Sequence, residues 1–178
     1  MTLFDIAIDF VLSQENGLAD DPKDPGGITN FGISLRSYPD LGADGIRSLT
    51  RSAATAIYRR DFWDPHHFEA LPPPLALACF DGAVNQGPRA SIRWLQHVLE
   101  LSPDGIIGPE TINRAFLAPL GATLRDFMVL RLVGYAALVT FPTFGHTWAK
   151  RALDCYRTAL GLIGNSEENT HEATKEGR

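Results

Sequence analysis

The part of the chain from Thr50 onward constrains the fold most, because nearly all of it follows a helical pattern. Four segments begin with a residue typical of a helix N-terminus: Thr50, the proline run 72–74, Pro88 and Pro109. Proline suits the first turn of a helix, since the N–H groups of that turn have no partner within the helix. Segments 120–138 and 143–163 continue the pattern. The sequence therefore predicts a mostly α fold.

The N-terminal segment 3–15 is a further amphipathic helix, and an acid stands at its end. Apolar residues recur at helical spacing in this segment: Phe4, Ile8, Val11 and Leu12. The pair 16–17 (Asn-Gly) should stop the helix, because both residue types tolerate positive φ. Glu15 is then expected at the edge of the core, where partial burial raises the pKa of a carboxyl and suits it to general acid catalysis. A solvated glutamate at a helix end is the simpler alternative.

Residues 18–49 form a long segment rich in Gly and Asp, with a small β element expected in 26–36. Asp24 follows Glu15 by nine positions and Thr29 follows it by fourteen. Inverting glycosidases hold a water between two carboxyl groups that lie about 6.5–9.5 Å apart. A loop that returns past the helix end would supply a second carboxylate and a hydroxyl. Ordinary turn chemistry is the alternative explanation of this composition.

Composition and simple motifs exclude several classes of function. A chain of 178 residues favours one domain, and a net charge of −5 argues against nucleic-acid binding. No apolar run is long enough for stable membrane insertion, and the first fifteen residues, with two Asp and no Lys or Arg, do not resemble a signal peptide. His66 and His67 are adjacent and do not converge on one metal, so we expect neither a metal nor an organic cofactor. Cys79 and Cys155 are expected to be buried free thiols.

Several polar and aromatic residues are candidates for a sugar-binding cleft. Asp81 and Asn85 share one face of an apolar helix, and polar groups placed there need partners or face a cleft. Aromatic rings at helical spacing suit either a sugar platform or the core. Arg131 is expected on a solvated helix face or in an ion pair. The predicted substrate contacts are Asp21, Asn30, Tyr38, Trp63, Asp81, Asn85, Phe144 and Trp148.

Five blocks of the sequence, in order, resemble the glycoside hydrolase family 108 muramidases. The first is ENG at 15–17, followed by DPKDPGGITNFGIS at 21–34. The others are LTRSAATAIYRRDFWD at 49–64, ACFDGAVNQGPRASIRWLQ at 78–96, SPDGIIGPETINR at 102–114 and FPTFGHTWAKRA at 141–152. The resemblance covers residues 4–160. It departs from the usual family pattern at position 16, where Asn replaces Gly.

The resemblance implies a lysozyme-like, mostly helical (α+β) domain, to which we assign residues 1–163. The polar composition of residues 164–178 predicts a disordered tail. Segment 95–160 contains the family's predicted peptidoglycan-binding region, which also reads as a turn and a helix start within the same domain. Family members hydrolyse the β-1,4 bond between N-acetylmuramic acid and N-acetylglucosamine. The resemblance makes Glu15 the catalytic acid. By analogy with the Glu-Asp-Thr spacing of phage-type lysozymes, Asp24 and Thr29 would position the water, although Thr29 falls one position short and Asp20 and Asp21 are rivals.

The expected partner is the peptidoglycan glycan strand, and we expect the protein to be a monomer. We expect synthesis in the cytoplasm without a signal peptide, passage through a holin-like route, and action on the cell wall during phage lysis or toxin release. A lytic transglycosylase and a non-catalytic cell-wall-binding module are the alternative functions.

Overall fold

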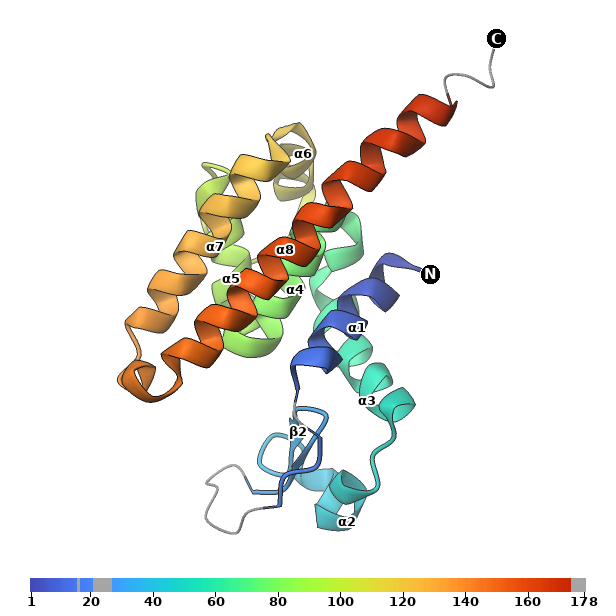
Figure 1. The fold of residues 1–178 in the computed structure, drawn as a ribbon, viewed down its shortest axis with the longest axis vertical. Helices are drawn as coiled ribbons and strands as arrows, with labels where there is room; N and C mark the ends of the chain where they lie inside the picture. Colours follow the sequence, from blue (N-terminus) through green and yellow to red (C-terminus); the bar gives the residue numbers. More distant parts are fainter. Residues whose placement is uncertain (16, 21–26, 174–178) are drawn as a thin grey trace.

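The computed structural model describes residues 1–15, 17–20 and 27–173, with side chains as far as residue 163. In this part of the chain the helices are α1 (Leu3–Gln14), α2 (Gly42–Arg47), α3 (Arg51–Tyr58), α4 (Pro73–Gln86), α5 (Pro88–Val98), α6 (Pro109–Leu117), α7 (Leu120–Ala136) and α8 (Phe141–Ala173). Figure 1 shows a hairpin and α2 at one end, the helices α4, α5, α7 and α8 at the other, and α1 and α3 between them. The mostly α prediction is confirmed, and no described helix is long and apolar enough to cross a membrane.

Helix α4 is the centre of the fold. It is buried almost continuously from Pro74 to Ala83 and packs against α1, α5, α7 and α8. The expected helix starts are confirmed: Thr50 caps α3 by accepting a hydrogen bond from the Ala53 N–H, and Pro88 and Pro109 are the first residues of α5 and α6. A helix that is apolar on all sides is stable only when neighbours cover it. The surrounding helices provide that cover.

An aromatic cluster joins α1 to α4. Trp63 ends the short π-helical turn η2 (Arg59–Trp63), and its ring packs edge-on against Phe4 and Phe80 at centroid distances of 5.3 and 5.1 Å. Phe68 completes the cluster, in the turn η4 (Phe68–Ala70). Trp63 is only 1% exposed. The prediction that Trp63 contacts substrate is therefore wrong, because its ring forms part of the core.

The predicted β element is a two-stranded hairpin. Strands β1 (Thr29–Asn30) and β2 (Ile33–Ser34) pair antiparallel. The two residues between them, Phe31 and Gly32, have φ values of 51° and 76°. Positive φ at both central positions is the geometry of a type I′ turn, whose twist matches that of the flanking strands. The turn carries Gly32 toward the end of α1.

Asn30 attaches this hairpin to α2. Its side chain is 6% exposed, and its Nδ2 donates to the carbonyl oxygens of Ile46 and Arg47 at 3.1 and 3.3 Å. The predicted substrate contact of Asn30 is therefore wrong, because the amide is already used within the fold. The short turn η1 (Pro39–Leu41) connects the hairpin region to α2.

Both ends of α1 have defined caps. Thr2 and Asp5 form a reciprocal capping box at the N-terminus. At the C-terminus Glu15 is the cap residue, and its extended backbone (φ −85°, ψ 130°) leads the chain out of the helix. Gly17 does not adopt positive φ, so that part of the expected helix stop is wrong. Residue 16 lies outside the described residues.

The buried side-chain amide of Gln96 stabilises a turn at residues 104–106. Gln96, 2% exposed, donates from Nε2 to Asp104 Oδ1 and to the Ile106 carbonyl, and accepts from the Gly105 N–H. The block 102–114 thus forms a turn and the start of α6 against α5. Helix α8 reaches Ala173 and enters the segment expected to be a tail. The boundary at residue 163 stays a prediction.

Candidate active site

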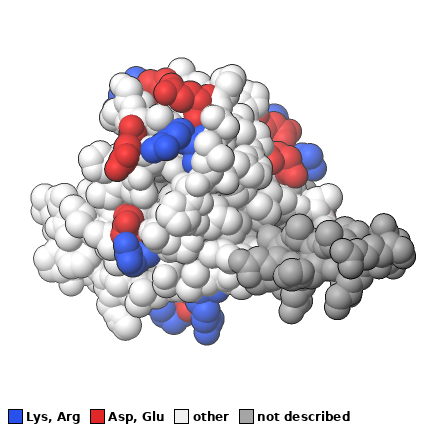
Figure 2. All heavy atoms as spheres, turned by 90° about the horizontal axis from the view of Figure 1, so that it is seen from above, with Lys and Arg blue, Asp and Glu red and all other residues white. Residues whose placement is uncertain are grey.

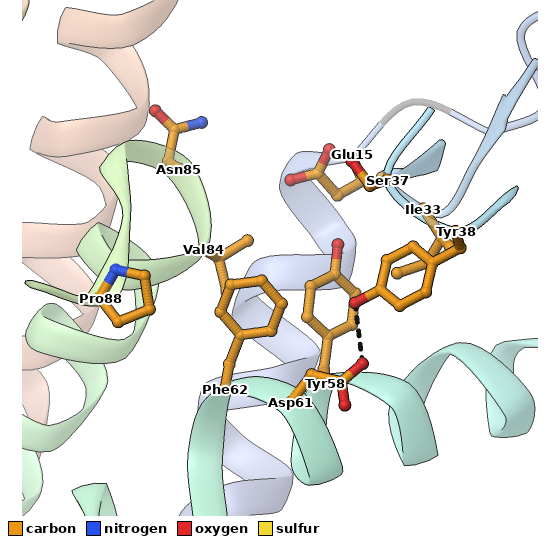
Figure 3. Close-up of a pocket in the computed structure, with 11 residues that line it drawn as sticks. Glu15, Ile33, Ser37, Tyr38, Tyr58, Asp61, Phe62, Val84, Asn85 and Pro88 are labelled. Carbon is orange, nitrogen blue, oxygen red and sulfur yellow. Dashed lines mark hydrogen bonds between the residues drawn. The ribbon is translucent and has the colours of Figure 1, made fainter. Parts of the chain in front are cut away.

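A pocket of about 620 Å³ lies beside the end of α1. Figure 3 shows the hairpin side (Ile33, Ser37, Tyr38) facing Val84, Asn85 and Pro88 from α4 and α5, with Tyr58 and Phe62 between the two sides. Glu15 stands at the top of the gap between them. The pocket is lined by Glu15, Gly32, Ile33, Ser37, Tyr38, Tyr58, Asp61, Phe62, Val84, Asn85 and Pro88.

Glu15 is held by an arginine from the other end of the chain. Its side chain is 20% exposed, and its Oε1 accepts a hydrogen bond from Nη1 of Arg151 on α8 at 2.7 Å. A carboxylate in this geometry gains a charge-assisted hydrogen bond that fixes its orientation. Glu15 is thus a partly buried acid at the wall of a pocket, and the alternative of a solvated glutamate does not hold.

Gly32 and Tyr58 close the space on the hairpin side of Glu15. The Tyr58 hydroxyl donates to the carbonyl of Phe31 at 3.0 Å. A Cβ atom at Gly32 would lie 2.5 Å from the Tyr58 hydroxyl oxygen and 2.9 Å from the Cδ of Glu15. Burial, and then the charge of Glu15, raises the pKa of Tyr58, so this phenol stays a neutral hydrogen-bond donor. A residue other than glycine would fit here only if Tyr58 or Glu15 moved.

A second carboxyl faces the pocket at Asp61. The Tyr38 hydroxyl donates to its Oδ2 at 2.9 Å, drawn as the dashed line in Figure 3. The hydrogen bond from Arg60 holds the pKa of Asp61 below its usual value. Burial and the hydrogen bond to Asp61 raise the pKa of Tyr38 to about 12. Tyr38 therefore lines the pocket as a neutral phenol beside an ionised carboxylate, and its contact with substrate stays a prediction.

Asp81 lies behind Glu15, between two arginines. Its side chain is fully buried; Oδ2 lies 2.8 Å from Nη1 of Arg131, and Oδ1 accepts a hydrogen bond from Nε of Arg151 at 2.9 Å. The predicted substrate contact of Asp81 is therefore wrong, because both carboxylate oxygens face guanidinium groups in the core. Arg131 is fully buried as well, so it is an ion-pair partner and does not lie on a solvated face.

Asn85 lines the pocket and connects it to the same buried charges. Its Oδ1 accepts a hydrogen bond from the hydroxyl of buried Tyr135, which in turn accepts one from Nη2 of Arg131 at 3.2 Å. Its Nδ2 makes no hydrogen bond to any described residue and points into the gap in Figure 3. Asn85 is therefore placed to donate to a ligand.

The remaining predicted contacts lie beside this pocket. Trp148 lines a neighbouring cavity of about 290 Å³ that also includes Asn85, and it stacks on Tyr135 at 5.0 Å. Phe144 is half exposed and packs on Trp148 at 5.7 Å. These two aromatic residues are not among the lining of the pocket that contains Glu15.

The second catalytic group stays a prediction. Thr29 is in β1, and its hydroxyl lies 3.4 Å from the Gly27 carbonyl. Asp20 forms a half-exposed ion pair with Arg47 at 3.0 Å. Asp21 and Asp24 lie outside the described residues. Within the described part of the chain no three His, Cys, Asp or Glu side chains gather as a metal site would require.

Arg151, Tyr58, Asp61 and Gly32 are site residues that the sequence reasoning missed. The role of Arg151 could have been inferred from the sequence, because this residue lies within a helical stripe of apolar residues: Trp148, Ala152, Cys155 and Ala159. A charge on a buried stripe needs a buried partner. The other three gave no comparable signal, since their roles depend on how the hairpin turns onto α1.

Charged side chains of both signs are mixed on one face of the molecule. On the face drawn in Figure 2, basic and acidic side chains lie beside one another and are separated by wide uncharged areas.

Comparisons with known proteins identify the family. The family model described as Glycosyl hydrolase 108 matches residues 8–87, which include Glu15, the hairpin, Asp61 and Asn85. The structure of Brucella abortus SagA matches with 32% sequence identity and a TM-score of 0.81, over 89% of this chain and 94% of that chain. A comparison with curated proteins finds no match. This chain therefore belongs to glycosyl hydrolase family 108 and is a glycoside hydrolase with a lysozyme-like fold that acts on peptidoglycan.

Proposed function

We propose that the protein is an N-acetylmuramidase that cleaves the β-1,4 bond between N-acetylmuramic acid and N-acetylglucosamine, with Glu15 as the general acid. The observation that carries the proposal is the position of Glu15: a partly buried carboxyl, fixed by Arg151, at the wall of a pocket of about 620 Å³. A general acid must stand within hydrogen-bond reach of the glycosidic oxygen that it protonates. A strand lying between the hairpin and α4 would bring that oxygen to Glu15.

The pocket supplies further contacts for such a strand. Phe62 and Tyr38 offer ring surface against the apolar faces of pyranoses, and Asn85 offers the unpaired Nδ2 donor described above. An acetamido carbonyl is a suitable acceptor for this donor. Peptidoglycan carries that group on both of its sugars, so the polar contact favours N-acetylated strands.

Hydrolysis also requires a water on the side of the sugar away from the acid. We propose that Asp24 and Thr29 position it, because both follow α1 on the segment that leads into the hairpin. Asp20 and Asp21 are rivals, and the half-exposed ion pair of Asp20 with Arg47 leaves it less free for this role. Without a positioned water, the same acid would act as a lytic transglycosylase.

Product chemistry tests the proposal. Purified sacculi are digested with the protein, and the soluble fragments are analysed by mass spectrometry before and after borohydride reduction. A muramidase leaves a reducible N-acetylmuramic acid end. An anhydro-muramic end, one water lighter and resistant to borohydride, would replace hydrolysis with transglycosylation. A reducible N-acetylglucosamine end would contradict the proposed bond.

We further propose a role in lysis of a cell or in release of a toxin through the wall. A peptidoglycan hydrolase opens the wall in either setting, and a holin-like pore would bring the enzyme to its substrate. Neighbouring genes distinguish the two: phage structural genes with a holin support lysis, and a toxin gene supports release. We also propose that the protein is a monomer, which light scattering would check.

A further inference from the structure

Asp81 is a buried charge that the proposed hydrolysis does not use directly. Four side chains of alternating charge run inward from the pocket: Glu15, Arg151, Asp81 and Arg131. Their exposed fractions fall from 20% at Glu15 to 8% at Arg151 and to zero at the last two. The chain of charges therefore begins at the pocket and ends in the core.

Arg151 contacts Asp81 on one side and Glu15 on the other. Its Nε donates to Asp81 Oδ1 at 2.9 Å, and its Nη2 lies 2.8 Å from the same oxygen. Its Nη1 points the other way, to Glu15 Oε1 at 2.7 Å. A guanidinium group is planar and rigid, so fixing Nε and Nη2 also fixes the direction of Nη1. The position of Asp81 thereby sets where Arg151 meets Glu15.

Asp81 is itself anchored from behind. Its Oδ2 lies 2.8 Å from Nη1 of Arg131, and Arg131 is held by Gln86 and Tyr135, through Nε at 3.0 Å and Nη2 at 3.2 Å. These contacts join α4 and α7, so the anchor is part of the buried helical core. Glu15, by contrast, is the C-cap residue of α1, at the point where the chain leaves the helix.

We propose that Asp81 is a positioning residue for catalysis: it holds Arg151 so that Arg151 orients the carboxyl of Glu15 in the pocket. The inference rests on the proposed function of Glu15. A second consequence follows from charge. With all four groups ionised the cluster is neutral, and loss of the Asp81 charge leaves one excess positive charge beside the acid.

The test is a double-mutant cycle on kcat and KM. Asp81→Asn keeps the shape of the side chain and removes its charge, and Arg151→Lys keeps the charge of Arg151 and removes its planar fork. Asp81→Asn is expected to lower kcat by about 10- to 100-fold, as a displaced catalytic group does, with KM for soluble peptidoglycan fragments little changed. In the Arg151→Lys background the same change is expected to lower kcat by less than about threefold, because the path from Asp81 to Glu15 is already broken.

Controls separate positioning from folding. Leu75→Ala, at a fully packed site on the same helix, weakens α4 without touching the charged cluster, so kcat should be retained at temperatures well below its melting point. Unchanged kcat in Asp81→Asn, or losses that multiply fully in the double variant, would overturn the inference. If Asp81→Asn does not fold, Arg131→Lys replaces it and should show the same dependence on Arg151. Glu15→Gln tests the proposed function separately: activity in that variant defeats the function itself, whatever the cycle shows.

Discussion

Gly32→Ala is the most informative small change in the site, because one methyl group meets both Glu15 and Tyr58. The added Cβ would lie 2.9 Å from Cδ of Glu15 and 2.5 Å from the Tyr58 hydroxyl oxygen, at a backbone φ of 76°. The left-handed conformation costs a non-glycine residue about 1–2 kcal/mol. Forcing a methyl group into a packed site costs about 1–3 kcal/mol. The expected loss in the free energy of unfolding is therefore about 2–5 kcal/mol.

Thermal melting and activity together read out this change. For a chain of this length each kcal/mol lowers the melting temperature by about 2–4 °C, so Gly32→Ala should melt about 4–20 °C below the wild type. Gly42→Ala is the matched control, because Gly42 also has positive φ (63°) but has no atom within 4 Å of the added Cβ. It should show only a backbone cost. The ψ of Gly42 is 168°, which with positive φ is a conformation almost confined to glycine, so this cost is about 1–3 kcal/mol and should lower the melting temperature by about 2–12 °C.

Activity separates the steric effect on Glu15 from the effect on stability. A displacement of the acid by about 1 Å is enough to lower the rate by about 10²-fold. Gly32→Ala should therefore clear sacculi much more slowly than the wild type at a temperature where both are folded, while Gly42→Ala keeps its activity. The reasoning is refuted if Gly32→Ala melts no lower than Gly42→Ala and clears sacculi at the wild-type rate.

Three further predictions follow from burial and charge. The pKa of Tyr38 is about 12 in the folded state, above that of a free tyrosine, so folding favours its neutral form. The stability that Tyr38 contributes is therefore complete below pH 10 and is lost as the pH rises toward 12. In urea titrations, Tyr38→Phe should lose less stability than the wild type over that range. Cys79 and Cys155 are fully buried, and burial raises the pKa of both thiols, so neither should react with Ellman's reagent until the protein is denatured, when two thiols should appear. Trp63→Ala should lower the free energy of unfolding by about 3–5 kcal/mol without raising KM, because the ring is part of the core. A raised KM at a temperature where the variant is folded would show that Trp63 contacts substrate after all.

The fold was predictable where local signals agree with the tertiary structure. Thr50, Pro88 and Pro109 begin helices because capping hydroxyls and the geometry of proline act within one turn. The hairpin at 29–34 lies within segment 26–36, where a small β element was expected. The identity of the turn residues was not foreseen, since Phe31 adopts a conformation that its type seldom takes.

The site was predictable at Glu15 and much less so around it. Glu15 stands at a helix end next to apolar residues, which is a local signal. Its partner Arg151 is 136 positions away, and only the packing of α8 on α4 brings the two together. Asp81 shows most clearly what the sequence could not predict. Its place on an apolar helix indicated that its carboxylate needs a partner. Residue spacing did not tell whether that partner is a ligand in a cleft or, as in the structure, two buried arginines.

The most direct test of the account is the rate at which Glu15→Gln releases reducing ends from purified sacculi. Gln nearly matches the shape of Glu and cannot donate the proton, and loss of a general acid lowers a rate by about 10²–10⁴-fold. Asp9→Asn is the matched control, since Asp9 is an exposed acid on α1 that pairs with Arg51 on the surface. We expect Glu15→Gln to be folded and slower by at least about 10²-fold, and Asp9→Asn to keep the wild-type rate. A folded Glu15→Gln that releases reducing ends at the wild-type rate would contradict the role of Glu15 as the general acid.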